Sequence, residues 1–201
     1  MVTLNDPVLA AHMQRLRNHG VTRDIALMVD PDLSLDAAGE RNLWAYEQLE
    51  LGYNYRMTDL EAALGLSQLG KLERFMGARQ ALSALYDRLL EPLAPTVQPV
   101  RAGEGQVVSP HLYGVRIAFD KLGGGRAALM RRLAARGVGT QVHYIPLYRQ
   151  PYFVRLCGPQ SLPGAEAWYA QALTLPLFPA MTPADVERVV QKLEAAVQAA
   201  G

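Results

Sequence analysis

The feature that most constrains the fold is a long helical stretch that opens with a capping box and closes at a group of prolines. In Thr58-Asp59-Leu60-Glu61 the threonine side chain can accept from the N–H three residues on, while the glutamate reaches back. Apolar side chains then recur at spacings of three, four or seven residues, which is typical of one helix face. They are Leu69, Leu72, Phe75, Met76, Leu82, Leu85, Tyr86 and Leu89. The pattern predicts the longest helix of the chain, ended by Pro92, Pro95 and Pro99.

Three glycines interrupt this stretch and weaken it. Gly65, Gly70 and Gly77 each cost a helix about 1 kcal/mol relative to alanine. Glycines inside a helix either kink it or permit close approach of a neighbouring backbone, so we expect one of these effects here.

The flanking sequence predicts a helical and then a mixed region. Residues 2–4 favour a strand, Asn5-Asp6-Pro7 predicts a helix start with Gly20 as its stop, and residues 20–50 read mainly as ordered loop. Further along we expect strands at 111–119 and 138–144 and helices at 126–136 and 163–173. A last helix is capped by Thr182 and ends near Ala199. This order predicts a small α+β or α/β lobe from about residue 105 onward.

Composition excludes several function classes. The chain has 201 residues, half of them apolar and 19% charged, which is ordinary for a globular protein. Lys and Arg total 20 against 19 for Asp and Glu, so the net charge of +1 gives no electrostatic case for a nucleic-acid partner. Cys157 is the only cysteine, which excludes an internal disulfide. No apolar run is long enough to cross a bilayer and no signal peptide is evident, so we expect a cytoplasmic protein with no membrane partner.

Polar groups concentrate in the segment Leu51–Asp59, directly before the capped helix start. Unpaired N–H groups and the helix dipole favour anions at such a position. Asn54 offers an amide donor, and Arg56 offers a planar fork suited to phosphate or carboxylate. A solvated surface turn, in which Asn54 tolerates an unusual backbone angle, is an equally good interpretation of these residues taken alone.

A second polar segment is Gln141-Val142-His143-Tyr144-Ile145-Pro146. On a strand, His143 would lie on the opposite face from Val142 and Tyr144. Taken alone, a single strand histidine is more often structural than catalytic. The four histidines lack the spacing of metal ligands, so no metal site is expected, and Gly123-Gly124-Gly125 lacks the residues of a phosphate-binding loop.

Four ordered segments together resemble the DegT/DnrJ/EryC1/StrS family of sugar aminotransferases. Leu51–Leu69, LGYNYRMTDLEAALGLSQL, resembles the family's most recognisable motif. Leu16–Arg23, Gln141–Pro146 and Leu173–Pro179 resemble family segments in the same order. Residues 44–57 and 143–152 are similar to the subgroup that aminates C4 of a UDP-linked 4-keto-6-deoxy amino sugar in the pseudaminic-acid pathway.

The resemblance implies a fold-type I enzyme dependent on pyridoxal 5′-phosphate (PLP), an α/β protein that acts as a homodimer with active sites at the subunit interface. It implies amino transfer from glutamate to a nucleotide-linked keto-sugar. Asn54 and Arg56 are then expected to bind the cofactor, with Asn54 reaching its phosphate across the dimer and Arg56 near that phosphate or the substrate diphosphate. Tyr55, His143 and Tyr144 are expected to contact the sugar nucleotide.

The resemblance also implies a division of the chain. Residues 1–57 would be a remnant of the large PLP domain with an interface loop, residues 58–104 the long interface helix and a proline-rich linker, and residues 105–201 the small C-terminal α/β domain. The chain is expected to start shortly after the family's Schiff-base lysine. Apolar residues that would pack on the large domain, such as Leu4, Leu9 and Met13, are then expected to be exposed.

Lysine is scarce, and none of the three lysines fits the catalytic position of the family. Lys71 falls in the long helix, Lys121 in a connection and Lys192 on the last helix. A PLP transaminase needs an amine nucleophile to hold its cofactor and to move a proton. We therefore expect no transaminase activity from this chain alone.

The residue in the position after Pro146-Leu147 also departs from the subgroup, which commonly carries a second histidine where this chain has Tyr148-Arg149. Three hypotheses stay open. The chain is part of an aminotransferase, or a non-catalytic nucleotide-sugar-binding or dimerisation module that needs a separate PLP domain, or an unrelated α/β domain.

Overall fold

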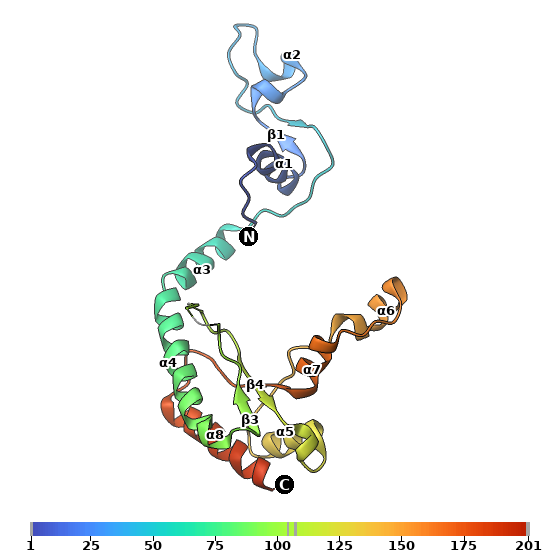
Figure 1. The fold of residues 1–201 in the computed structure, drawn as a ribbon. Helices are drawn as coiled ribbons and strands as arrows, with labels where there is room; N and C mark the ends of the chain where they lie inside the picture. Colours follow the sequence, from blue (N-terminus) through green and yellow to red (C-terminus); the bar gives the residue numbers. More distant parts are fainter. Residues whose placement is uncertain (1, 104, 107, 200–201) are drawn as a thin grey trace. The chain divides into compact units, whose positions relative to one another are not determined.

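The computed structural model describes residues 2–103, 105, 106 and 108–199, and these form two compact units. The first unit spans Met1–Leu69 and the second spans Gly70–Gly201. Figure 1 shows the elements of each unit along the chain. The predicted division at residues 57 and 104 stays a prediction.

The first unit is built from short elements around one well-capped helix. α1 covers Pro7–Arg17, and the Asp6 side chain accepts from the N–H groups of Val8 and Leu9, which confirms the predicted helix start. Its further elements are β1 (Val21–Thr22), η1 (Ile25–Leu27), α2 (Pro31–Ser34), β2 (Glu47–Gln48) and α3 (Asp59–Leu69). β1 and β2 pair antiparallel. Residues 2–4 lie outside any strand, contrary to expectation, because no described strand pairs with them.

The first unit has almost no apolar core of its own. Ala45 is its only hydrophobic residue that is fully buried among those the structure describes. α3 buries no residue, and its leucines Leu60, Leu64, Leu66 and Leu69 are all exposed. Leu9 is exposed as expected, whereas Leu4 and Met13 are half-buried. The first unit therefore holds its shape mainly through hydrogen bonds and close backbone contacts.

The predicted long helix is present as two helices. α3 ends at Leu69, Gly70 and Lys71 form a turn, and α4 runs over 19 residues, Leu72–Leu90. The break falls at one of the three glycines that the sequence identified as weak points. The Thr58–Glu61 capping box is confirmed, because Thr58 N–H donates to Glu61 Oε2 at 2.8 Å and Glu61 N–H donates to Thr58 Oγ1 at 3.3 Å.

The second unit is a three-stranded antiparallel sheet with order β3-β4-β5. β3 is Val97–Pro99, β4 is Tyr113–Ile117 and β5 is Ala172–Leu175. The remaining elements are η2 (Glu91–Leu93), η3 (Phe119–Lys121), α5 (Gly125–Ala135), η4 (Leu147–Arg149), α6 (Pro151–Cys157), α7 (Pro163–Gln171) and α8 (Pro183–Gln198). Figure 1 shows the sheet with α4, α5 and α8 gathered around it. The mixed helix and sheet class that the sequence predicted is confirmed.

The core of the second unit forms where these helices meet the sheet. The alternating burial of β4 directs Tyr113, Val115 and Ile117 inward, as expected of a half-buried strand. Leucine and valine side chains of the helices complete the core. The fully buried members include Leu90, Leu129, Leu133, Val186 and Leu193.

Two secondary-structure predictions in this unit are wrong, and they concern segments that contact each other through Gln141 and Thr174. Residues 138–144 do not form a strand and contribute only an isolated bridge from Gln141 to Thr174. The helix predicted to reach Leu173 ends at Gln171, and β5 begins at Ala172. β5 takes the place beside β4, so it gains the long ladder that the earlier segment does not have.

The burial of α8 in the core gives a test of where the stability of the second unit resides. Leu193 is fully buried, so Leu193→Ala should lower the free energy of unfolding by about 2–5 kcal/mol. The matched control is Leu156→Ala on α6, where the leucine is 67% exposed and the expected change is within about 0.5 kcal/mol. Urea unfolding measures both, and equal effects would contradict this core assignment.

Candidate functional site

The segment that carries Asn54 and Arg56 lies against the C-terminal end of α1 through backbone hydrogen bonds. Tyr53 N–H donates to Leu16 O at 2.7 Å, and His19 N–H donates back to Tyr53 O at 2.9 Å. Tyr55 N–H donates to Arg17 O at 3.0 Å. The predicted site segment is therefore fixed by its main chain, even though its side chains are exposed.

Two glycines make this contact sterically possible. Gly20 has a left-handed φ of 71°, and a Cβ at this position would lie 1.8 Å from Glu50 O. A Cβ on Gly52 would lie 2.1 Å from Gly20 N. Only residues without side chains allow the two backbones to come this close. His19, with φ of 61°, adopts a left-handed conformation that is uncommon outside glycine.

Glu50 anchors the same segment through its side chain. Its Oε1 accepts from Arg15 Nε and its Oε2 accepts from His12 Nε2, each at 2.6 Å. The hydrogen bond from Arg15, followed by that from His12, holds the pKa of the Glu50 carboxyl below its ordinary value of 4.5. The sequence predicted mainly ordered loop for residues 20–50, whereas the structure gives the Glu50 carboxylate two partners from one turn of α1.

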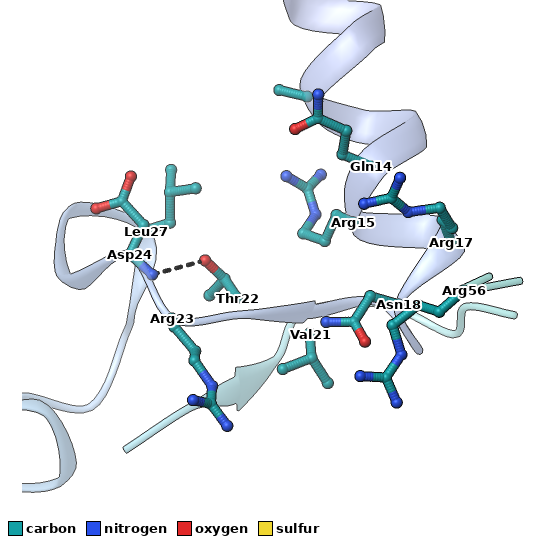
Figure 2. A pocket seen from close by; sticks show the side chains of 11 residues that line it. Gln14, Arg15, Arg17, Asn18, Val21, Thr22, Arg23, Asp24, Leu27 and Arg56 are labelled. Atoms are coloured by element: carbon teal, nitrogen blue, oxygen red, sulfur yellow. Dashed lines mark hydrogen bonds between the residues drawn. The ribbon is translucent and has the colours of Figure 1, made fainter. Parts of the chain in front are cut away.

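A hollow of about 390 Å³ opens beside this anchored segment. Figure 2 shows its lining, which includes four arginines and one aspartate. The four are Arg15, Arg17, Arg23 and Arg56. Arg15 is paired with Glu50, and the other three arginines outnumber the single carboxylate of Asp24, so positive charge dominates the hollow.

This arrangement is suited to a phosphate-bearing anion. Arginine presents several N–H donors in a plane and binds phosphate oxygens in pairs. The sequence predicted that the helix N-terminus would favour an anion here, but the structure places the positive charge elsewhere. At the start of α3, the Thr58 N–H already donates to Glu61, and Asp59 adds a second carboxylate in the first turn. The arginines of the hollow, and not the helix N-terminus, supply the positive charge.

The predicted residues of the first unit hold different places in this arrangement. Arg56 lines the hollow, and Asn54 forms a backbone bridge with Asn18, which also lines it. Tyr55 stacks on Tyr53 with ring centroids 4.8 Å apart. Arg17, Asn18 and Arg23 lie in a segment that the sequence flagged only through its resemblance to the family.

His143 and Tyr144 lie in the second unit. His143 Nδ1 is 2.8 Å from Thr174 Oγ1, and the indole N–H of Trp168 donates to His143 O at 3.4 Å. The Tyr144 and His143 rings form a T-shaped pair with ring centroids 4.5 Å apart, and Tyr144 is 71% exposed. Thr174 is a partner of His143 that sequence reasoning missed, although its place between two leucines was a strand signal.

Tyr148 and Arg149, the position where the subgroup commonly has a histidine, are committed to another contact. Tyr148 OH donates to Glu166 Oε1 at 2.7 Å, and Arg149 Nε donates to the same oxygen at 2.9 Å. The Arg149 and Tyr148 hydrogen bonds keep the pKa of Glu166 below its ordinary value. These side chains fasten η4 to α7.

The three lysines all belong to the second unit. Lys71 precedes the first residue of α4, Lys121 ends η3, and Lys192 Nζ donates to Arg136 O at 2.6 Å. Among the described residues, no group of three or more His, Cys, Asp or Glu side chains is placed to hold a metal ion. None of the described helices is both long and apolar enough to cross a membrane.

The fold matches that of sugar aminotransferases. Residues 1–194 match the DegT/DnrJ/EryC1/StrS aminotransferase family, and the chain belongs to this family. An uncharacterized protein of Methanocaldococcus jannaschii is 32% identical over 196 residues, which are 96% of this chain and 48% of that protein.

Two solved structures share the fold. The Helicobacter pylori aminotransferase PseC, involved in the biosynthesis of pseudoaminic acid, aligns with a TM-score of 0.81 at 24% identity, over 97% of this chain and 47% of PseC. Spr1654 of Streptococcus pneumoniae, in its PMP-form, aligns with a TM-score of 0.80 at 23% identity, over 98% of this chain and 46% of Spr1654. The chain therefore spans about half the length of the proteins it matches.

The Glu50 anchor predicts a pH dependence for the loop. Because folding lowers the pKa of this carboxyl, its contribution is present above pH 4.5 and is lost as the pH falls through the folded-state value. In Glu50→Gln, the amides of Tyr53 and Tyr55 should exchange hydrogen faster than in the wild type at neutral pH. This difference should shrink below pH 4.5.

The control for this experiment is Glu40→Gln, at an exposed glutamate of the same unit whose side chain makes no hydrogen bond or ion pair recorded for the described residues. It should leave the exchange of Tyr53 and Tyr55 unchanged. Identical exchange in the wild type and in Glu50→Gln at neutral pH would contradict the anchoring role.

Proposed function

We propose that this chain is the C-terminal part of a cytoplasmic, PLP-dependent nucleotide-sugar aminotransferase that moves an amino group from glutamate to a 4-keto-6-deoxy sugar. Membership of the family supports the reaction class. The observation that carries the proposal is the arginine-lined hollow beside the anchored Asn54–Arg56 segment. Both the cofactor and a nucleotide-linked sugar bear phosphate, which this hollow is charged to bind.

Asn54 and Arg56 are the residues that would hold the cofactor phosphate. An arginine fork and an amide donor suit phosphate oxygens, and the backbone contacts with α1 orient both residues before any ligand arrives. When bound, PLP supplies the electron sink that makes amino transfer between glutamate and a keto-sugar feasible. Tyr55, His143 and Tyr144 are proposed to contact the sugar nucleotide.

The proposed assembly is a homodimer in which Asn54 and Arg56 serve the partner's cofactor. The exposed leucines of α3 support this, because an 11-residue helix without buried contacts is marginal in water and gains stability by packing on another surface. Glutamate as the donor and a pseudaminic-acid precursor as the acceptor follow from the sequence resemblance, and the likeness to PseC is in keeping with that pathway.

A second candidate is a non-catalytic nucleotide-sugar-binding or dimerisation module that pairs with a separate PLP domain. The positions of the lysines favour keeping it, because Lys192 is bonded to a backbone carbonyl and the other two lie at element boundaries. None of them lies in the unit that carries Asn54 and Arg56.

The two candidates share one prediction for the chain as it stands. Mixed with PLP, it should show no absorbance change of the kind that PLP gives when it is bound to a lysine, and no turnover of glutamate. A lysine-dependent band with glutamate turnover would contradict this expectation. Adding a separately produced PLP domain then separates the candidates, because only the module hypothesis expects activity to appear on mixing.

The site assignment is tested in the longer protein that joins this segment to a lysine-bearing PLP domain. Arg56→Ala should weaken PLP retention about 10- to 100-fold, the effect of losing a charge-assisted hydrogen bond, and Asn54→Ala should weaken it less. Arg131→Ala, at an exposed arginine of α5, is the matched control and should change nothing. If both site variants retain PLP and turn over the sugar normally, Asn54 and Arg56 are not the phosphate ligands.

A further inference from the structure

We propose that Thr174 is a positioning residue that orients the His143 ring so that Nε2 faces the ligand. The inference rests on the proposed function, because it takes His143 as a residue that contacts the sugar nucleotide. Its basis is the 2.8 Å separation of His143 Nδ1 and Thr174 Oγ1. This is the only hydrogen bond of the ring within the part of the chain that the structure describes, so Nδ1 is occupied and Nε2 is available.

Thr174 holds the main chain near His143 as well as its ring. Its N–H donates to Gln141 O at 2.8 Å, and Gln141 N–H donates to Thr174 O at 3.2 Å. These two bonds form the isolated bridge that remains where the sequence predicted a strand. One residue of β5 therefore fixes the backbone two residues before His143 and the imidazole itself.

Thr174 is itself held rigidly. Its neighbours Leu173 and Leu175 are each only 1% exposed and anchor β5 in the core. Because strand side chains alternate between faces, Thr174 points to the face opposite these leucines. The β4 residue in register with it is Gly114, which has no side chain to compete for that face. The branched threonine side chain has a restricted χ1, which limits the positions that its hydroxyl can occupy.

The surroundings of His143 confine the ring further. Trp168 donates its indole N–H to His143 O, and the Tyr144 ring stands at 82° to the imidazole. The ring is half-buried, and among the residues that the structure describes the Thr174 hydroxyl is the one polar group bonded to it. A threonine hydroxyl can donate to Nδ1 or accept from it, so losing the hydroxyl removes whichever of these two bonds favours the tautomer present.

The test compares three substitutions in the full chain. Thr174→Val keeps the shape of the side chain and removes the hydroxyl. Thr174→Ser keeps the hydroxyl, and Thr174→Ala removes both the hydroxyl and the methyl group. ¹⁵N NMR of the histidine rings, with His143→Gln to assign the signal, reports the tautomer and protonation of the imidazole. We expect Thr174→Val and Thr174→Ala to shift the tautomer balance of His143, and Thr174→Ser to preserve it.

The second readout is titration with UDP as the probe. Thr174→Val and Thr174→Ala should weaken UDP binding about 2- to 12-fold, the effect of one neutral hydrogen bond. Thr174→Ser should bind UDP within about twofold of the wild type. An unchanged His143 tautomer balance in both variants that lack the hydroxyl would overturn the proposal. Equal weakening of UDP binding by Thr174→Ser and Thr174→Val would also overturn it, because the loss of the hydroxyl would then not be the cause.

The two readouts separate this proposal from the proposed function. In one outcome, UDP leaves the ¹⁵N signal of His143 unchanged in the wild type while Thr174→Val still changes the tautomer balance. That result supports the positioning contact. In that case the assignment of His143 to the sugar nucleotide fails.

Discussion

The close contact between the backbones of Gly20 and Gly52 is the constraint on which the first unit depends. With only one fully buried apolar residue among its described positions, this unit has little hydrophobic driving force. Its site segment is held by main-chain hydrogen bonds to the end of α1, and these form only because neither glycine has a Cβ. A side chain at either position would move the segment away from α1, and Asn54 and Arg56 with it.

Charge distribution follows from the same contact. Once the segment lies on α1, the Glu50 carboxylate reaches Arg15 and His12, and Arg15 is neutralised inside the lining of the hollow. Glu50 therefore pairs with only one of the four arginines that line the hollow. It withdraws one from the hollow and leaves the others to meet an incoming anion, while it strengthens the hold of the segment on the helix.

The features that could be predicted from the sequence are those fixed by residues close together in the chain. The Thr58 capping box and the Thr182 helix cap depend on residues three positions apart, and both form as expected. The strand predicted at 138–144 failed for the opposite reason. Its alternation is a fair strand pattern, but β5 has a similar pattern around Thr174, and which of them pairs with β4 is settled by packing between distant residues. The arginine hollow was also beyond local reasoning, because Arg17 and Arg56 are brought together only when the glycine contact forms.

Asn54 and His143 lie in different units, yet both are placed by the same physical means. Each is a partly or fully exposed polar residue, and one or two positions before it lies a residue whose N–H and C=O both make backbone hydrogen bonds. Tyr53 has this role for Asn54, and Gln141 has it for His143. Side-chain bonds then add to this hold: Glu50 ties the segment before Asn54 to α1, and Thr174 bonds the His143 ring itself. Because exposed side chains lose conformational freedom on binding, fixing the backbone beforehand lowers the entropy cost of capturing a ligand. The residues that decide affinity in such a protein therefore include positions that touch no ligand.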